Sequence, residues 1–181
     1  RVFVSGGSGV IGRELVQQLY QLGADIWVGD LLPRPTSFPP AIRYRQGDLN
    51  YLTVAEVEAF RPEVFIHLAA TFERSTETYD FWEENYQHNV RLSHHLMTLL
   101  KKCTSLVRVV FASSYLIYDK RLYSFDTPQQ QAVSLAEHTD ISSRNVCGAA
   151  KLYFECELDF LQHFLSESCS FVSARIYRSY G

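Results

Sequence analysis

The sequence predicts an α/β fold: a doubly wound parallel sheet with helices on both faces. Short runs of β-branched and aromatic residues alternate along the chain with longer segments whose apolar residues have helical spacing. A glycine-rich turn separates the first run from the first helical segment. A later run, residues 62–70, is apolar almost throughout, as expected of a parallel strand that is covered on both faces.

The first half of the sequence contains three predicted strands and two predicted helices. The strands are residues 1–7, 24–30 and 42–49. The first helix spans residues 10–23 and stops at a glycine, and the second lies within residues 50–60, where Thr53 is a suitable N-cap. The proline-rich residues 31–40 are interpreted as a connection between these elements rather than a domain boundary.

The second half continues the same alternation. Strands are predicted at residues 62–70, 106–114 and 170–177, and helices at residues 79–102 and 145–165. A polar loop covers residues 119–143. His67, inside a predicted strand, is interpreted as a buried, hydrogen-bonded group rather than a catalytic base. We find no internal repeat, so residues 1–181 are predicted to form one Rossmann-type domain.

Composition narrows the class of protein. The 46% hydrophobic and 20% charged residues are typical of a globular protein, and a net charge of −3 does not indicate a nucleic-acid partner. The four cysteines show no CxxC spacing, so the sequence indicates neither a metal site nor a disulfide framework. We therefore expect the protein in the reducing cytoplasm. No apolar run is long enough to span a membrane, and no leader segment is expected.

The segment GGSGVIG places Gly6, Gly9 and Gly12 between the first strand and its helix. Glycine at these positions permits a tight turn, close approach to a phosphate and close packing of the helix. The helix begins at Val10 and Ile11, and its free N–H groups can bind an anion. A purely structural turn is the alternative interpretation.

Asp30 ends the second predicted strand, a little over 20 residues after the glycines begin. A carboxylate at this point can accept hydrogen bonds from the ribose hydroxyls of a dinucleotide. Because it repels a 2′-phosphate, it favours NAD over NADP. Arg34 and Arg43 lie close in the sequence and leave this preference open, and an exposed loop aspartate is the alternative.

Three further motifs accompany these features: GDL at residues 47–49, HLAA at 67–70 and FASS at 111–114. Together with the glycine spacing, they resemble the extended short-chain dehydrogenase/reductase family. The resemblance is narrower to the NAD-dependent nucleotide-sugar epimerases and dehydratases. It covers the whole chain, and it implies that a substrate-binding region follows Gly181.

The resemblance also implies roles for individual residues. Ser114 would hydrogen-bond the reacting hydroxyl, and Arg178 would meet the substrate where the family usually has asparagine. A homodimer through the two long helices is a further implication of the family. The implied cofactor-binding residues are Asp48 and Leu49 at the adenine, Leu68, Ala69 and Ala70 along the groove, Asn89 on the long helix, and Tyr177 near the nicotinamide.

The segment RNVCGAAK departs from the family at its chemical centre. The family carries a catalytic tyrosine four residues before a lysine that also holds the nicotinamide ribose. The resemblance places Lys151 at the lysine and Cys147 at the tyrosine, and no other lysine in the chain follows a tyrosine by four residues. A cysteine sulfur lies ~4 Å nearer the backbone than a tyrosine oxygen.

The sequence therefore leaves three hypotheses. The first is an NAD-dependent enzyme acting on a nucleotide sugar by transient hydride transfer, with Ser114, Lys151 and Cys147 as its catalytic residues. The second is an NAD-binding protein without hydride transfer, in which the cofactor is structural or regulatory. The third is an introduced tyrosine-to-cysteine substitution.

Overall fold

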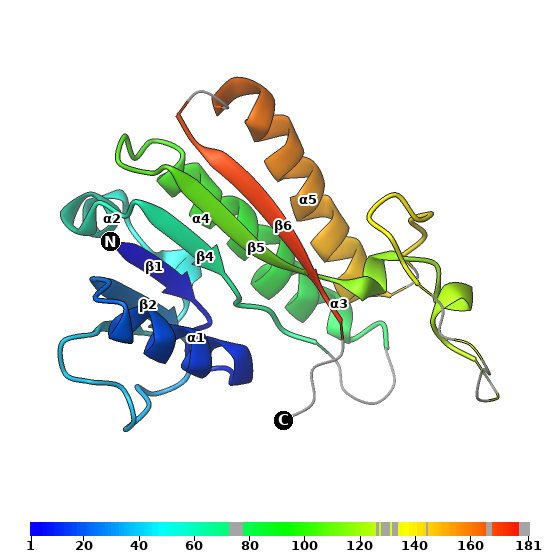
Figure 1. The fold of residues 1–181 in the computed structure, drawn as a ribbon, viewed down its shortest axis with the longest axis horizontal. Helices are drawn as coiled ribbons and strands as arrows, with labels where there is room; N and C mark the ends of the chain where they lie inside the picture. The colour runs from blue at the N-terminus through cyan, green and yellow to red at the C-terminus, as the bar shows by residue number, and fades with distance from the viewer. Residues whose placement is uncertain are drawn as a thin grey trace.

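A computed structural model describes residues 1–72, 78–125, 127, 131, 134–143, 145–165 and 168–177. These residues form a parallel six-stranded sheet in the order β3-β2-β1-β4-β5-β6 (Figure 1). The strands are β1 (Val2–Ser5), β2 (Ile26–Asp30), β3 (Arg43–Gln46), β4 (Val64–His67), β5 (Arg108–Ser114) and β6 (Ser170–Ile176). The doubly wound parallel sheet is thus confirmed.

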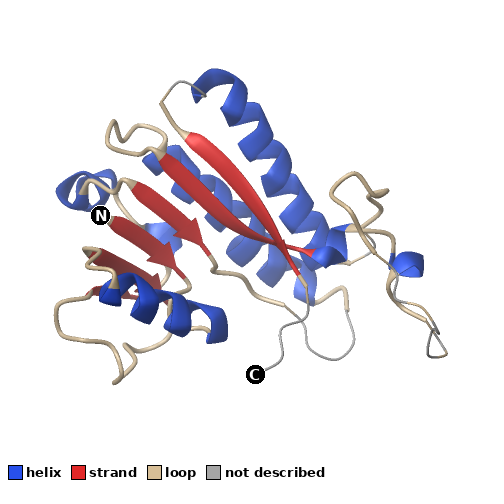
Figure 2. Ribbon diagram, viewed as in Figure 1, coloured by secondary structure: helices blue, strands red, loops and turns tan. Residues whose placement is uncertain are grey.

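Helices connect the strands (Figure 2). Four short 3-10 or π segments join them: η1 (Leu49–Tyr51), η2 (Tyr86–Arg91), η3 (Tyr115–Ile117) and η4 (Lys120–Leu122). The α-helices are α1 (Val10–Gln21), α2 (Val54–Phe60), α3 (Phe81–Asn85), α4 (Leu92–Leu100) and α5 (Val146–Leu165). Thr53 caps α2 with a complete capping box, as its position predicts.

Two apolar layers hold the helices to the sheet. On one face α1 packs through Val16 onto β1 and β2. On the other face α2, α4 and α5 cover the sheet with a larger cluster, in which the Phe3 and Trp27 rings stack at 4.5 Å. The residues of β1 and β2 are buried throughout, which explains why β1 is apolar up to Val4 and β2 up to Val28.

The order of the strands creates a crevice. From β1 the chain first builds outward through β2 and β3, and then returns to place β4 on the other side of β1. The connections that leave the carboxyl ends of β1 and β4 therefore diverge. Ligands of open α/β sheets bind at such a switch point.

Several predicted elements differ from the observed ones. Strand β3 ends at Gln46, and Leu49, predicted as the end of that strand, begins the segment η1. Strand β4 ends at His67, so residues 68–70 follow it as an irregular segment rather than as strand. The predicted helix at 79–102 is interrupted by the π segment η2. Apolar periodicity does not detect a single wide turn, because it changes the spacing only once. Within the described part of the chain, no helix combines the length and apolarity that crossing a membrane requires.

Candidate functional site

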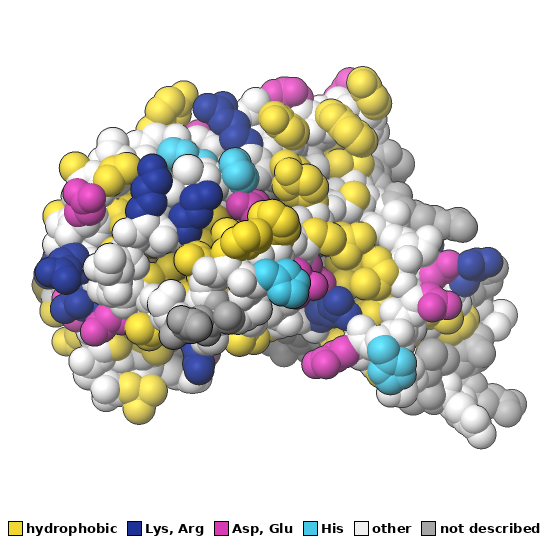
Figure 3. Space-filling view, turned by 90° about the horizontal axis from the view of Figure 1, so that it is seen from above, with side chains coloured by type: hydrophobic (Ala, Val, Ile, Leu, Met, Phe, Trp, Pro, Cys, Tyr) yellow, Lys and Arg dark blue, Asp and Glu magenta, His cyan; other side chains and the backbone are white. Residues whose placement is uncertain are grey.

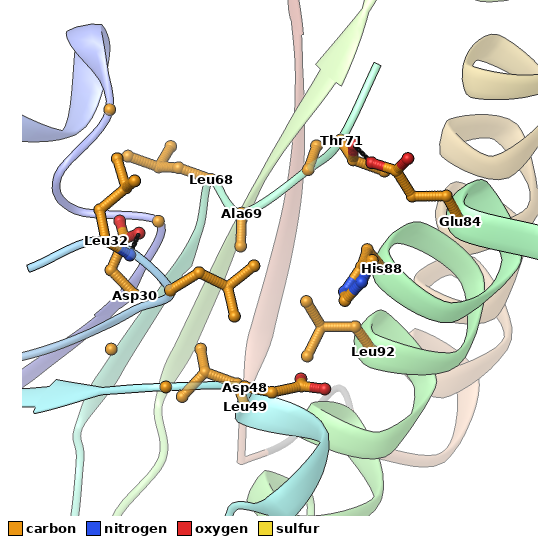
Figure 4. Close-up of a pocket in the computed structure, with 16 residues that line it drawn as sticks. Asp30, Leu32, Asp48, Leu49, Leu68, Ala69, Thr71, Glu84, His88 and Leu92 are labelled. Carbon is orange, nitrogen blue, oxygen red and sulfur yellow. Dashed lines mark hydrogen bonds between the residues drawn. The ribbon is translucent and has the colours of Figure 1, made fainter. Parts of the chain in front are cut away.

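A hollow of about 410 Å³ lies at the switch point, and we call it the first hollow. Figure 4 shows its walls: Asp30 and Leu32 on one side, the segment from Leu68 to Thr71 above, and side chains of α3, η2 and α4 opposite. The lining includes the predicted residues Gly6, Gly9, Asp30, Asp48, Leu49, Leu68, Ala69 and Ala70. Eight residues predicted from scattered motifs thus meet at one place.

The glycine turn approaches its neighbours too closely for a side chain. Gly6 has a φ of 74°, and a Cβ there would lie 2.5 Å from the Ala69 backbone nitrogen. At Gly12 a Cβ would lie 2.5 Å from the Gly6 carbonyl oxygen. Gly9 is the N-cap of α1, and no side chain caps this helix. Its first N–H groups therefore point to the turn without a side-chain acceptor, which suits an anion.

We expect Gly6→Ala to lower the free energy of unfolding by about 3 kcal/mol or more, because it combines an unfavourable φ with a backbone clash. Gly23→Ala is the matched control, since Gly23 has a φ of 81° but open space around its Cβ. That control should cost only about 1 kcal/mol. Urea unfolding of both variants measures the difference, and equal losses would contradict the clash.

The Asp30 carboxylate is held in place by backbone groups. Its Oδ2 accepts the Ser8 N–H at 2.8 Å, and its Oδ1 accepts the Leu32 N–H at 2.9 Å. The Ser8 hydroxyl in turn lies 2.6 Å from the Tyr44 hydroxyl. Each carboxylate oxygen retains a further lone pair for a ligand. Asp30 is therefore a preorganised acceptor rather than a free loop residue.

The two nearby arginines are occupied elsewhere. Arg34 donates to three carbonyl groups of its own loop, at Phe38, Pro39 and Ile42. Arg43 pairs with Asp25 at 3.6 Å. Neither guanidinium lines the first hollow. Neither arginine therefore pairs with the Asp30 carboxylate, which would repel a 2′-phosphate.

A second hollow, of about 390 Å³, adjoins the first and shares Leu68 and Ala70 with it. It contains the predicted chemical residues Ser114, Cys147 and Lys151, and also Ile11 and Tyr177. The two hollows together form one groove across the carboxyl ends of the strands. Most of the residues predicted to bind the nucleotide line the first hollow, and those predicted to carry the chemistry line the second.

Lys151 is buried in this second hollow. Its Nζ donates to the Ala112 carbonyl at 2.7 Å and lies 4.7 Å from the centre of the Phe111 ring. Burial lowers the pKa of Lys151 to about 8, and the nearby Cys147 acts weakly in the opposite direction. The Cys147 Sγ lies 3.7 Å from the Thr71 carbonyl oxygen. A lysine held here presents a cationic group to the groove.

Ser114 has two roles. It lines the second hollow at the end of β5, and its Oγ accepts the Leu116 N–H at 3.2 Å as the N-cap of η3. Ser114 therefore caps η3, and its side chain still lines the second hollow. The remaining lone pair and the hydroxyl proton stay available to a ligand.

Some predicted residues do not line either hollow. Asn89 is buried behind the groove, where its amide accepts the Thr71 N–H and donates to the Thr71 carbonyl, both at 2.8 Å. It holds the groove wall rather than forming it. Val10 is exposed on the first turn of α1, and Gly12 packs the helix onto the turn. Arg178 lies outside the described residues.

Sequence reasoning missed several residues of the first hollow. Glu84 and His88 face it from α3 and η2, and the Thr71 hydroxyl donates to Glu84 at 2.5 Å (Figure 4). Outside the lining, the Ser8 N–H binds Asp30 directly, and the Tyr44 hydroxyl contacts the Ser8 hydroxyl. Only the position of Ser8 inside the glycine motif gave a signal, because the others come from distant elements.

His67 is confirmed as a buried, hydrogen-bonded residue. Its Nδ1 lies 2.6 Å from the Ser5 hydroxyl and its Nε2 lies 2.8 Å from the Ser93 hydroxyl. Burial, and secondarily the charge of Lys151, lowers the pKa of His67 to about 3. The ring is therefore neutral in the folded protein, and its two hydrogen bonds connect β4 to Ser5 and Ser93.

This pKa predicts a pH dependence of stability. Between pH 6.5 and about 3 the unfolded chain binds a proton at His67 that the folded chain does not, so stability falls as the pH falls. From pH 7 to pH 5 the loss from this residue should be about 2 kcal/mol. Unfolding free energies of wild type and His67→Gln at both pH values isolate it. The same pH dependence in both proteins would contradict the assignment.

Comparison with known proteins gives a family and a fold. Residues 2–181 match the profile of the NAD dependent epimerase/dehydratase family. A structure of MoeE5 in complex with UDP-glucose and NAD is 26% identical, with a TM-score of 0.77 over 99% of this chain and 55% of that chain. A UDP-galactose 4-epimerase is also 26% identical, with a TM-score of 0.73 over 96% of this chain and 55% of that chain.

UDP-glucose 4-epimerase from Brucella ovis in complex with NAD shares the fold at 23% identity, with a TM-score of 0.79 over 99% of this chain and 52% of that chain. The comparison with curated proteins gives no match. The chain spans about half the length of the solved structures it matches. The family profile covers nearly every residue of the chain, from the glycine turn to the last strand. The chain belongs to the NAD-dependent epimerase/dehydratase family.

Proposed function

We propose that this chain binds NAD and is the cofactor-binding part of an epimerase or dehydratase that acts on a nucleotide sugar. The observation that carries the proposal is the continuous groove, which joins the glycine turn and Asp30 at one end to Ser114 and Lys151 at the other. Solved relatives with the same fold are described with NAD and UDP-sugars. These features support a dinucleotide laid across the carboxyl ends of the strands.

Each end of the groove suits one half of the cofactor. The glycine turn and the N-terminus of α1, which has no side-chain cap, suit the pyrophosphate. Asp30 suits the adenosine ribose. Asp48 and Leu49 lie beside the adenine end of the first hollow. At the other end, Lys151 holds the nicotinamide ribose and Tyr177 lies beside the ring.

NAD supplies a reversible hydride acceptor when it is bound. The protein must then position the sugar hydroxyl and move its proton. Ser114 orients that hydroxyl by hydrogen bonding, and the ammonium group of Lys151 stabilises negative charge that develops on oxygen. At the family's tyrosine position this chain carries Cys147, so the proton acceptor differs from the family's.

Cys147 favours a second candidate function, in which NAD binds without hydride transfer. Its sulfur is directed to the Thr71 carbonyl, and the residue is 7% exposed. A thiol in this place is too short to reach a hydroxyl positioned for a tyrosine. In that case the bound cofactor would have a structural or a regulatory role.

The two candidates are separated by incubating the full-length protein with NAD and a panel of UDP- and TDP-sugars. Product formation together with a transient reduced-nicotinamide absorbance supports the enzyme. Tight NAD binding by calorimetry without product or reduced cofactor supports the second function. Failure to bind NAD would exclude both.

We also propose a homodimer in the cytoplasm. Trp82 and Tyr86 on α3 and η2, and Tyr153, Phe160 and Phe164 on α5, are all exposed by roughly half or more. Figure 3 shows hydrophobic side chains gathered in patches on one face of the molecule. Exposed apolar patches of this kind mark interaction sites. Sedimentation equilibrium of wild type and Phe160→Ser tests the dimer, and a monomeric wild type would refute it.

A further inference from the structure

We propose that Glu155 is a positioning residue, which fixes Lys151 relative to Ser114 in the second hollow; this inference rests on the proposed function. Glu155 lies on α5, one helical turn after Lys151, and is 9% exposed. It lines a third hollow and neither of the two that form the groove. Glu155 therefore acts on a ligand of the groove through the residues that it binds, and not by touching the ligand.

Helix α5 lies against β5 and β6 (Figure 1), and two of its successive turns bind two successive residues of β5. The Lys151 ammonium group donates to the Ala112 carbonyl at 2.7 Å, and the Ser113 hydroxyl donates to the Glu155 carboxylate. Side chains four residues apart share one face of a helix, so both bonds act along the same side of α5. Ser114 is the next residue of β5. These two bonds therefore set the register between Lys151 and Ser114.

An ion pair ties Glu155 to a second strand. Arg175 on β6 donates from Nη2 to the Glu155 Oε2 at 2.8 Å and from Nε to the Oε1 at 3.2 Å. Its Nη1 donates to the Tyr118 hydroxyl at 3.0 Å and to the Glu137 carbonyl at 2.7 Å. The hydrogen bond to Glu155 raises the pKa of Arg175 further above its ordinary value, so this guanidinium keeps its charge. Glu155 thus joins α5 to both β5 and β6 through directional bonds.

The direction of these bonds matters more than their strength. A buried ion pair contributes little net stability, because taking both charges out of water offsets their attraction. Guanidinium and carboxylate, however, bind in a fixed fork geometry. A slide of α5 by one residue would move Lys151 by ~1.5 Å and break its bond to Ala112. Because a misplacement of ~1 Å can lower a rate by ~100-fold, a contact that prevents this slide bears directly on turnover.

The first test measures the place of Lys151 without turnover. In full-length protein labelled at the lysine Cε with an NMR-active carbon isotope, the signal that Lys151→Arg removes belongs to Lys151. Its titration should give a pKa of about 8 in wild type. We expect Glu155→Gln to raise this pKa by about one unit, because a displaced ammonium group regains contact with water. Cys147 and His67, the titratable groups that interact with Lys151 among the described residues, are the same in both proteins.

The sign of the change separates position from charge. Removing the negative charge of Glu155 without moving Lys151 would lower the pKa of the ammonium group or leave it unchanged. Either of those two results in a folded Glu155→Gln protein overturns the proposal.

Two further variants make this test specific. Glu157→Gln is the matched control, because Glu157 lies on the same helix and pairs with His94 of α4 at 2.9 Å. It should leave the pKa of Lys151 unchanged. Ser113→Ala removes the bond to β5 and keeps the ion pair with Arg175, so it gives a result even where Glu155→Gln fails to fold. We expect it to raise the pKa of Lys151 in the same direction, and a wild-type value would overturn the proposal.

The second test measures turnover of the sugar nucleotide that wild type converts, with kcat expressed per folded molecule from circular dichroism. We expect Glu155→Gln to lower kcat by about 30-fold and Ser113→Ala by about 10-fold, through misplacement of Lys151. The KM for the sugar should change by less than about 3-fold, because Glu155 does not line the groove. A variant that is only less stable keeps the wild-type kcat per folded molecule, and that result overturns the proposal while leaving the proposed function intact. A wild type that makes no product with bound NAD overturns both.

Discussion

Replacing Lys151 with methionine is expected to abolish turnover, by about 1000-fold or more, while making the folded protein more stable. The loss of activity follows because Lys151 is the cation that lines the second hollow among its described residues. The gain in stability follows because its ammonium group is buried, and burial lowers the pKa of Lys151 from 10.5 to about 8. Methionine removes the charge and fills a similar volume.

The size of the stability gain depends on pH. Below pH 8 the lysine is charged in both states and the folded state carries the whole penalty, which is about 3 kcal/mol from the pKa difference. The lost hydrogen bond to Ala112 offsets about 1 kcal/mol of it. Between pH 8 and 10.5 the folded lysine releases its proton first, so wild-type stability rises and the gain shrinks.

Chemical unfolding at pH 7 and pH 10 measures this gain, and kcat of the full-length protein measures the activity. Lys102→Met is the matched control, because Lys102 is exposed and lies far along the chain from the groove. It should change neither property. A Lys151→Met variant that is less stable than wild type at pH 7 would show that the buried ammonium is better compensated than its surroundings indicate.

Replacing Asp30 with asparagine is expected to weaken NAD binding by about 30-fold, or about 2 kcal/mol. Asparagine keeps one oxygen for the Ser8 or Leu32 N–H but loses the charge and the second acceptor that the ribose hydroxyls require. The same change removes the repulsion of a 2′-phosphate. The preference for NAD over NADP should therefore fall together with the affinity for NAD.

Calorimetric titration with NAD and NADP measures both effects. Asp25→Asn is the control, because Asp25 precedes the same strand, pairs with Arg43 and does not line the groove. Its Kd for NAD should equal that of wild type. Wild-type protein that binds NADP more tightly than NAD would refute the role of Asp30, and would indicate that Arg34 leaves its three carbonyl partners to meet a phosphate.

Much of the fold follows from local patterns. Residues 10–23 and 145–165 have helical spacing, and most of β1 and β2 is apolar because both faces are covered. The strand after residue 62 was predicted too long, because Leu68, Ala69 and Ala70 continue its apolar run although they line a groove. Hydropathy does not distinguish an apolar ligand site from a core.

The candidate site was predicted best where a motif carries a backbone requirement. Gly6 and Gly12 leave no room for a Cβ, and Asp30 stands at a strand end, so sequence position alone defines their surroundings. Asn89 was predicted as a cofactor contact, yet its amide is used by Thr71. An amide on a helix face gives no sign of which neighbour it will bind.

The sequence by itself determined the doubly wound sheet, the glycine turn, the acidic end of β2, and the spacing of four residues between Cys147 and Lys151. These are properties of spacing and residue type, which need no partner from elsewhere in the chain. Only the tertiary structure decided that Arg34 and Arg43 turn away from the groove, that Lys151 is buried, and that Glu155 is bound to β5 and β6 one turn beyond it. Those outcomes depend on which distant elements the strand order brings together at the switch point, and on the desolvation that this packing imposes.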